Sequence, residues 1–423
     1  MHHFTYKNGF LHAESVDIRT LASTVGTPFY CYATATLERH FQVFEEAFSD
    51  RDSLVCYAVK VNSNQAVLRT LARMGAGMDI VSGGELFRAL DAQVPASKIV
   101  YSGIGKTEDE INAALEAGIY CFNVESEPEL QLLSDIAESK GLKAPVALRV
   151  NPDVDAQTHA KIATGKSENK FGIPIARARE IYARAAQMRG LNVIGVDAHI
   201  GSQITSLEPF DNLAKKLAHL AKELLQDGHQ LKHIDFGGGL GIPYKSDNSP
   251  PPTPQEYAET IKKHTGTLNL KLIFEMGRLI AGNAGILVSK VLYVKKGEKK
   301  TFIIIDAAMN DLIRPTLYDA YHRIEPVRES LLKRDFIEAD IVGPVCETGD
   351  YLALQREMAP VAAGDLVAVM TAGAYGAVLS STYNTRPLIP EVLVKNDSYA
   401  IIRPRPSYED IVKLDRVPDW LQP

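Results

Sequence analysis

The stretch LVCYAVKVNSNQAVLRTLARMGAGMDIV, residues 54–81, contains the repeating unit that decides the fold. An apolar run at 54–59 is followed by a segment whose apolar residues recur every three or four positions, which indicates an amphipathic helix. A second short apolar run, 78–81, completes the unit. Two strands joined by a helical connection of this length are expected to lie parallel in one sheet.

The same alternation of short apolar runs and helical segments continues toward the C-terminus. Six more runs rich in apolar and β-branched residues are predicted strands, at 98–102, 120–124, 146–150, 193–200, 233–236 and 272–276. Eight strands separated by helices are typical of a parallel (β/α)8 barrel, also called a TIM barrel. A doubly wound open sheet is the competing architecture. The count of eight, and the polar residues at the strand ends, favour the barrel.

The alternation stops after Arg278, and the remaining sequence indicates a second, mainly β domain. Segments 285–309 and 365–376 are predicted strands joined by turns, and residues 4–18 are a predicted hairpin around Asn8-Gly9. A chain of 423 residues is also too long for one ordinary compact domain. We therefore expect an α/β barrel over 35–282 and an all-β domain, a β-sandwich or β-barrel, built from 1–34 together with 283–423.

Composition and charge exclude several classes of function. Apolar residues make up 45% of the chain, charged residues 23%, and the formal net charge is −6, which is ordinary for a soluble protein. Without long basic runs, nucleic-acid binding is a poor hypothesis. No apolar run approaches the ~18 residues of a membrane span, and the polar N-terminus is unlike a signal peptide. The four cysteines are too widely spaced for a disulfide framework or a metal site. These observations predict a cytoplasmic enzyme without a metal.

Chemically useful residues occur where the predicted strands end, which is where a barrel carries its active site. Lys60 follows the first strand, His199 the sixth, the glycine-rich loop 237–241 the seventh, and Glu275 ends the eighth. Each has a plain structural explanation: a lysine reaching solvent, a core histidine, a flexible turn, and an ion pair to a nearby arginine. Together they offer a partly desolvated amine for Schiff-base chemistry, backbone N–H groups for phosphate and a carboxylate for a pyridinium. This combination indicates a pyridoxal phosphate site.

These residues lie in motifs that extend over nearly the whole chain. In order, the motifs are YAVKVN (57–62), HIGSQ (199–203), DFGGGLGIPY (235–244), EMGR (275–278), DAAMNDLIRPTLYDAYH (306–322), GPVCETGD (343–350) and GAYG (373–376). With this set the chain resembles the fold type III pyridoxal phosphate-dependent decarboxylases, and within them the diaminopimelate decarboxylases. One departure is Met276, where the family has a proline; it is minor if the backbone there makes the contact.

The resemblance implies a role for each residue that would bind the cofactor, pyridoxal 5'-phosphate. Lys60 would bind it covalently, Glu275 would pair with its ring nitrogen, and His199 would stack on its ring. These three would act in catalysis together with a fourth residue, Cys346. The residues implied to hold or cover the phosphate are Ser202, Gly237, Gly238, Gly239, Glu275, Met276, Gly277, Arg278 and Tyr375.

Cys346 differs in its setting from the other three cysteines. Cys31, Cys56 and Cys121 lie in apolar runs and are expected to be inert core residues. Cys346 lies in a polar loop, where it is either a chance thiol or, as the resemblance implies, the proton donor. In the latter case it reaches the active site of the other subunit of a homodimer.

The resemblance further implies a set of substrate-binding residues, Arg278, Arg314, Tyr318, Glu347 and Tyr375. Planar guanidinium groups bind a carboxylate in a bidentate manner, and Glu347 would accept the distal ammonium. The set matches meso-2,6-diaminopimelate, which would be decarboxylated to L-lysine and CO2 in the last step of lysine biosynthesis. A surface ion pair is the alternative for Arg314. Segment 151–171 is long and polar, and we expect a mobile loop that closes over the site.

Three other functions are compatible with this fold. A catalytically inactive paralogue could act as a binding protein, but Lys60, Glu275, His199 and Cys346 are all present. An enzyme like alanine racemase shares the barrel, but that family places an arginine at the ring nitrogen, where this chain has Glu275. A decarboxylase for another basic or tethered amino acid would keep the same chemistry, and the sequence leaves this alternative open.

Overall fold

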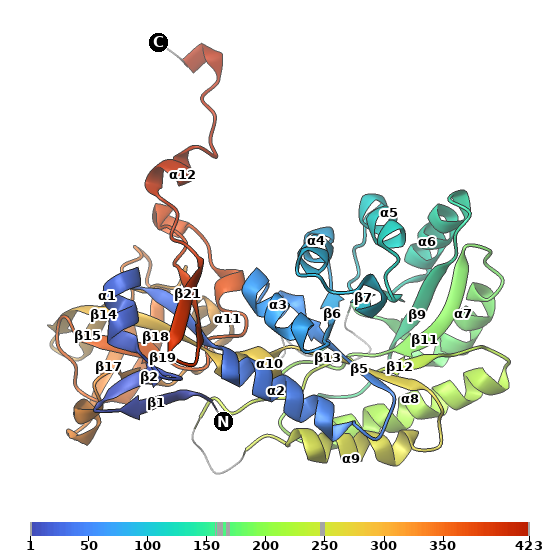
Figure 1. The fold of residues 1–423 in the computed structure, drawn as a ribbon, viewed down its shortest axis with the longest axis horizontal. Helices are drawn as coiled ribbons and strands as arrows, with labels where there is room; N and C mark the ends of the chain where they lie inside the picture. The colour runs from blue at the N-terminus through green and yellow to red at the C-terminus, as the bar shows by residue number, and fades with distance from the viewer. Residues whose placement is uncertain (1, 157, 159–163, 166–169, 246–249, 422–423) are drawn as a thin grey trace. The chain divides into compact units, whose positions relative to one another are not determined.

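The computed structural model describes residues 2–156, 158, 164–165, 170–245 and 250–421, which form two compact units (Figure 1). The barrel unit is Leu37–Ala281, and the β unit combines Met1–Thr36 with Gly282–Pro423. Each unit has its own sheet and its own core, and each is described by itself.

Eight parallel strands form the sheet of the barrel unit. Their order is β9-β11-β12-β13-β5-β6-β7-β8, and pairing of β8 with β9 closes the barrel. The strands are β5 Ser53–Ala58, β6 Gly77–Ile80, β7 Ile99–Tyr101, β8 Cys121–Val124, β9 Ala144–Asn151, β11 Leu191–Asp197, β12 His233–Asp235 and β13 Lys271–Met276. All eight predicted strands are therefore confirmed, and closure excludes the open sheet. The two-residue β10, Ile173–Pro174, adds to β9 and was not predicted.

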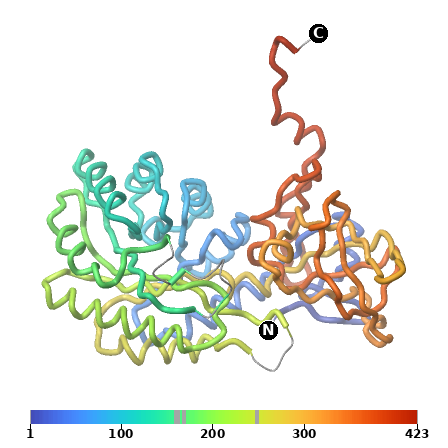
Figure 2. The backbone as a smooth tube through the Cα atoms, turned by 180° about the vertical axis from the view of Figure 1, so that it is seen from behind, coloured from blue at the N-terminus to red at the C-terminus, as the bar shows by residue number. Residues whose placement is uncertain are grey.

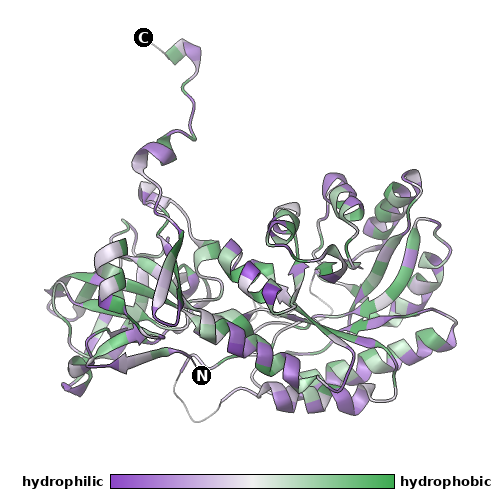
Figure 3. Cartoon of the chain, in the orientation of Figure 1, coloured by the Kyte–Doolittle hydropathy of each residue, from purple (hydrophilic) through white to green (hydrophobic). Residues whose placement is uncertain are grey.

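Helices alternate with these strands and surround them. They are α2 Thr34–Ala47, α3 Gln65–Arg73, α4 Gly83–Asp91, α5 Glu108–Ala117, α6 Glu127–Ser139, α7 Ala178–Ala185, α8 Glu208–Gln226, α9 Pro254–Thr265 and the short α10 Arg278–Ala281. Side-chain caps begin many of them; Thr107 and Thr253 form capping boxes that satisfy free N–H groups in the first turn. The strands are largely hydrophobic and the helices are mixed (Figure 3), as expected when helices cover a buried sheet.

The β unit contains a nine-stranded mixed sheet and a small three-stranded sheet. The large sheet runs in the order β18-β17-β15-β14-β4-β20-β21, while β19 pairs with β14 and β16 with β19. Its strands are β4 Phe29–Ala33, β14 Gly285–Lys296, β15 Thr301–Ile305, β16 Ile324–Pro326, β17 Ile337–Val342, β18 Tyr351–Met358, β19 Leu366–Val369, β20 Glu391–Lys395 and β21 Ser398–Arg403. The small sheet contains β1 Phe4–Lys7, β2 Phe10–Ala13 and β3 Val16–Asp17. Three helices complete the unit, α1 Ile18–Val25, α11 Arg314–Tyr318 and α12 Tyr408–Val412.

Segments from the N-terminal and C-terminal parts of the chain pair with one another inside the β unit. The predicted hairpin forms β1 and β2, and Asn8 and Gly9 both have the positive φ that a tight primed turn requires. Strand β4 lies between β14 and β20, which come from far later in the sequence. In Figure 2 the blue N-terminal segment runs among the orange and red strands of this unit.

Among the described residues, no helix is both long and apolar enough to cross a membrane.

Candidate active site

Lys60 lies just beyond the end of β5, in a single 3-10 turn, Val59–Val61. Its Nζ is 2.8 Å from Oδ2 of Asp79, which stands on the neighbouring strand β6. The Lys60 side chain is 36% exposed, whereas that of Asp79 is fully buried. The buried carboxylate therefore holds an accessible amine in place. The sequence indicated Lys60 as a candidate but not its partner Asp79. An acid inside the apolar run 78–81 could have been recognised as a candidate.

Glu275 is buried at the end of β13. Its Oε1 accepts hydrogen bonds from Ser102 Oγ at 2.9 Å and from Asn123 Nδ2 at 3.2 Å. Burial, followed by the negative charge of Asp79, raises the pKa of Glu275 from its ordinary 4.5 to about 7. A cation placed beside it would be strongly favoured, because it would stabilise the ionised carboxylate. The sequence predicted Glu275 but neither of its two donors.

The His199 ring is fixed by the glycine-rich loop that follows β12. Nδ1 accepts a hydrogen bond from the Gly238 N–H at 3.0 Å, so in the neutral ring the proton is on Nε2. Burial lowers the pKa of His199 well below its ordinary value, and the positive charges of Arg149 and Lys60 add to the effect. The imidazole is thus a neutral, oriented plane two residues beyond the end of β11.

The glycine-rich loop fits tightly against its neighbours, with no room for side chains. Gly237 and Gly239 have positive φ angles of 61° and 106°, which favour glycine. A Cβ at Gly238 would lie 2.3 Å from the carbonyl oxygen of Glu275, and one at Gly239 would lie 2.5 Å from that of Gly201. Gly277, after β13, is equally restricted, because its Cβ would lie 2.3 Å from a methyl group of Val61. Together these glycines bring bare backbone to one edge of the barrel, which is what a phosphate cradle needs.

Arg278 and Ser202, which the resemblance implies as phosphate-binding residues, meet beside this loop. Nε and Nη2 of Arg278 donate to Ser202 Oγ at 3.2 and 3.1 Å, and Nη1 donates to the Tyr244 hydroxyl at 2.6 Å. Arg278 is buried. Much of the predicted loop 151–171, namely 157, 159–163 and 166–169, lies outside the described residues. In its described part, Thr158 and Thr164 donate to the carbonyls of Ser202 and His199.

In the β unit, Arg314 opens helix α11 and is only 6% exposed. Its Nη1 donates to Nε2 of His322 at 3.1 Å, while Nδ1 of His322 lies 2.9 Å from the Met370 carbonyl oxygen. Because arginine can only donate, His322 accepts on Nε2 and carries its proton on Nδ1. The alternative of a surface ion pair for Arg314 is therefore wrong. His322 was missed as a partner, although it ends the same motif.

The loop 343–350 packs against α11 in the same unit. Thr316 Oγ1 donates to the Gly349 carbonyl at 2.6 Å, and Asp350 accepts the N–H groups of Met309 and Val345, each at 2.6 Å. The side chains of Cys346 and Glu347 are exposed on this loop. The other cysteines, Cys31, Cys56 and Cys121, are buried, as predicted.

The predicted site residues thus fall into two groups, one in each unit. The barrel unit brings together Lys60, His199, Ser202, Gly237–Gly239 and Glu275–Arg278 at the carboxyl ends of its strands. The β unit carries Arg314 and Tyr318 on α11, and the loop that contains Cys346 and Glu347 is hydrogen-bonded to the same helix through Thr316 and Gly349. Tyr375 also belongs to the β unit, in a left-handed turn with φ 55°. Because each unit is described by itself, Arg278 and Arg314 are not placed relative to one another.

Comparisons with known proteins agree with this geometry. Residues 34–282 match the family model described as pyridoxal-dependent decarboxylase, pyridoxal binding domain. The chain is 49% identical to the diaminopimelate decarboxylase of Vibrio cholerae over 422 residues and 47% identical to that of Zymomonas mobilis over 421, covering 99% of each chain. The chain belongs to the diaminopimelate decarboxylase family.

Solved structures of the diaminopimelate decarboxylase family share the fold over nearly the full length. The enzyme from Helicobacter pylori, complexed with L-lysine, is 39% identical with a TM-score of 0.90, covering 94% of this chain and 99% of that one. The enzyme from M. jannaschii, in co-complex with L-lysine, is 36% identical with a TM-score of 0.94 and 99% coverage of both. The predicted barrel with a C-terminal β domain is confirmed, and so is the predicted cofactor, pyridoxal phosphate.

The barrel mouth fits this cofactor on its own chemistry. An accessible amine, a glycine loop with bare backbone and no room for a Cβ, and a buried carboxylate are the three groups that an aldehyde, a phosphate and a pyridine nitrogen require. These three groups account for the match to the cofactor, and the match requires no further charged residue at the barrel mouth.

Proposed function

We propose that this chain decarboxylates meso-2,6-diaminopimelate to L-lysine and CO2 with pyridoxal phosphate, the last step of lysine biosynthesis. The observation that carries the proposal is the convergence of Lys60, Glu275, His199 and the glycine cradle at one end of the barrel. Full-length identity of 47–49% with diaminopimelate decarboxylases supports the choice of substrate.

Pyridoxal phosphate supplies the electron sink that accepts the bonding pair when CO2 leaves an amino acid. Lys60 would hold the cofactor covalently through Nζ, and its ion pair with Asp79 orients the free amine toward this attachment. Glu275 keeps a proton on the ring nitrogen, because its carboxylate is buried and gains most from a neighbouring cation. The proposed role of His199 is to stack on the ring and fix its plane, and the hydrogen bond from Gly238 orients the imidazole for this.

The phosphate is held by backbone and side-chain donors of the barrel unit. The tight packing of the loop supports this assignment, since any Cβ at Gly238 or Gly239 would collide with backbone oxygens. Ser202 and Arg278 add a hydroxyl and a guanidinium next to the loop. The remaining proposed contacts are Gly237, the backbone of Met276 and Gly277, and Tyr375, which closes over the phosphate.

In this proposal, residues of the β unit together with Arg278 recognise the substrate, and a residue of the β unit donates the proton that replaces CO2. Arg278, Arg314 and Tyr318 bind the distal carboxylate, Glu347 accepts the distal ammonium, and Tyr375 adds a further contact. Cys346 donates the proton that replaces CO2. Its exposed thiol supports this role, because a proton donor must reach the substrate, while the other three thiols are buried.

We further propose a homodimer in which each subunit contributes Cys346 to the active site of its partner. The exposed position of this thiol and of Glu347 supports a shared site. The four cysteines are free, which suits a cytoplasmic enzyme. The proposed domain boundaries are 35–282 for the cofactor-binding barrel, and 1–34 together with 283–423 for the β domain.

The direct test is a decarboxylation assay that compares meso-diaminopimelate with L-lysine, L-ornithine and L-arginine. We expect CO2 and L-lysine from diaminopimelate, at a kcat/KM far above that for the three monocarboxylic substrates. Faster release of CO2 from one of those three would replace the proposed substrate but keep the chemistry. Failure to take up pyridoxal phosphate would overturn the whole proposal.

A further inference from the structure

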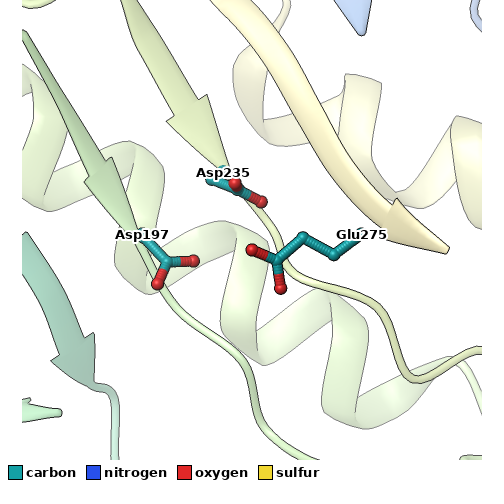
Figure 4. Close-up of side chains that lie close together, drawn as sticks. All are labelled: Asp197, Asp235 and Glu275. Carbon is teal, nitrogen blue, oxygen red and sulfur yellow. The ribbon is translucent and has the colours of Figure 1, made fainter. Parts of the chain in front are cut away.

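Two further acids, Asp197 and Asp235, lie beside Glu275 inside the barrel. They end β11 and β12, the strands next in order to β13, and the three carboxyl groups point toward one another (Figure 4). One carboxyl oxygen of each residue lies within 4.8 Å of an oxygen on both others. Asp235 is fully buried, Asp197 is 1% exposed and Glu275 is 6% exposed. Three negative charges in so small and dry a space would repel one another strongly.

The hydrogen bonds around the three acids leave two oxygens without donors. Asp235 Oδ1 accepts the Gly237 N–H at 2.9 Å, but its Oδ2 is buried and meets no donor in the described part of the chain. Asp197 Oδ1 is in the same situation. Glu275 Oε1, in contrast, accepts from two side chains. Since buried carboxylate oxygens need donors, the hydrogens available to this trio are those on the carboxyl groups themselves.

The surrounding cations are already engaged by other acids. Lys60 pairs with Asp79 at 2.8 Å, and Arg149 pairs with Glu125 at 3.0 Å. A third buried cation, Lys106, pairs with Glu129 at 2.7 Å. Among the described residues named here, six acids therefore face three cations. Burial lowers the pKa of His199, so its neutral ring adds no positive charge. Burial raises the pKa of the interior thiols, Cys56 and Cys121, so they stay neutral and add no negative charge. Without a bound cation, the trio can be neutralised only by bound protons.

We propose that Asp197 and Asp235 are protonated positioning residues whose acid O–H groups donate within the trio and leave Glu275 as its ionised member. This inference rests on the proposed role of Glu275 at the cofactor ring nitrogen. With the two aspartates neutral, the trio carries a single negative charge, and that charge is on the residue that faces the cofactor. The aspartates thereby set the protonation state of Glu275 without touching the cofactor.

The direction of the titrations agrees with this geometry. Burial, and then the charge of Glu275, raises the pKa of both aspartates well above the ordinary value of 3.8. The native state therefore keeps protons that the unfolded chain releases as the pH rises above about 3.8. Stability contributed by these two groups is present at acid pH and is lost with rising pH. An asparagine keeps a donor and an acceptor in the same places and has no proton to lose.

The first experiment uses infrared difference spectra of the full-length protein, with and without pyridoxal phosphate, at pH 7. Wild type minus Asp235→Asn, and wild type minus Asp197→Asn, should each show the loss of a carboxylic-acid carbonyl band. The control is Asp340→Asn, because Asp340 is a buried acid that pairs with Lys300 at 2.8 Å. Its difference spectrum should show the loss of an ionised carboxylate. Loss of an ionised carboxylate in both test variants would overturn the proposal.

The second measurement is the urea midpoint of the same variants between pH 5 and pH 8. Relative to wild type, Asp235→Asn should gain stability as the pH rises, whereas Asp340→Asn should be destabilised at pH 7 by loss of its ion pair. A urea midpoint for Asp235→Asn that falls relative to wild type with rising pH would contradict the protonation of Asp235.

Metal analysis of the protein before and after chelation accompanies these measurements, because a bound cation could also offset the charge of the trio. A stoichiometric metal would overturn the proposal.

The third measurement connects the aspartates to the cofactor. Asp235→Ala removes the acid O–H group that donates within the trio, so Glu275 should take up a proton itself. The protein should then bind pyridoxal phosphate more than tenfold more weakly. The absorbance of the bound cofactor should also titrate at a different pH. Asp235→Asn should restore both properties toward wild type, which a merely structural role would not explain. If wild type takes up no pyridoxal phosphate, the proposed function fails. If wild type takes it up and Asp235→Ala titrates as wild type does, only this inference fails.

Discussion

The barrel unit and the β unit hold their functional side chains in different ways. In the barrel, each of three side chains is fixed by groups from another strand or loop. Lys60 pairs with Asp79 of β6, Glu275 accepts from Ser102 and Asn123, and His199 accepts from the backbone N–H of Gly238. In the β unit, Arg314 is buried and fixed by His322, but Cys346 and Glu347 are exposed on a loop. A cofactor that stays bound needs a rigid site, whereas groups that meet an exchanging substrate must be reachable.

This difference predicts how variants in the two units behave. Changes in the barrel should alter cofactor binding and chemistry together, because the same residues serve both. Changes in the β unit should leave the cofactor bound and alter turnover or substrate choice. Three substitutions test the contrast, beginning with the largest expected effect.

Lys60→Ala should abolish covalent attachment of the cofactor and lower kcat/KM by roughly 10⁴-fold, the upper range for a catalytic group. The measurement is loss of the visible absorbance of the lysine-bound cofactor, followed by the decarboxylation assay. Lys60→Arg is the matched control, since it keeps the positive charge opposite Asp79 without a primary amine. Activity in either variant close to that of wild type would remove Lys60 from the centre of the barrel site.

Arg314→Ala should raise KM for diaminopimelate and leave the cofactor absorbance unchanged. An unpaired distal carboxylate costs about 2–5 kcal/mol, or tens to thousands of fold in kcat/KM. The ratio of kcat/KM for diaminopimelate to that for L-lysine separates lost recognition from general damage. Arg314→Lys should recover part of the effect, because a lysine keeps the charge but not the bidentate geometry. An unchanged ratio would assign Arg314 to structure alone.

Cys346→Ala should lower kcat by about a hundredfold while the cofactor remains fully bound. Alkylation should have the same effect on wild type, because Cys346 is the exposed thiol among four. Thr348→Ala, in the same loop, is the control for loop damage. If Cys346→Ala turns over as fast as wild type, the proton comes from another group and the contrast between the units weakens.

The sequence predicted the barrel well because its strands are largely buried. Buried parallel strands such as 54–59 and 272–276 are continuous apolar runs, so their number and order can be read directly. The candidate residues Lys60 and Glu275 were identified for the same reason, since they interrupt or end apolar runs. The two-residue strand β10 has no such run and was missed.

The partners of these residues were harder to predict. Asp79 and His322 are each brought to their partner by the fold rather than by spacing in the sequence. Asp197 and Asp235 were visible as acids at the ends of apolar strands, and the predicted barrel places their strands next to that of Glu275. Their closeness depends on the register, in which Asp197 pairs with Asp235 across β11 and β12, and the sequence alone does not give the register.

The place of β4 in its sheet has a consequence for synthesis on the ribosome. This strand, Phe29–Ala33, pairs with β14 and β20, which are made only after the entire barrel. The barrel segment can therefore complete its own closed sheet during translation, while the N-terminal strand waits without its neighbours until the last part of the chain emerges. During that interval β4 is an unpaired apolar edge, and the nascent chain is most exposed to aggregation then.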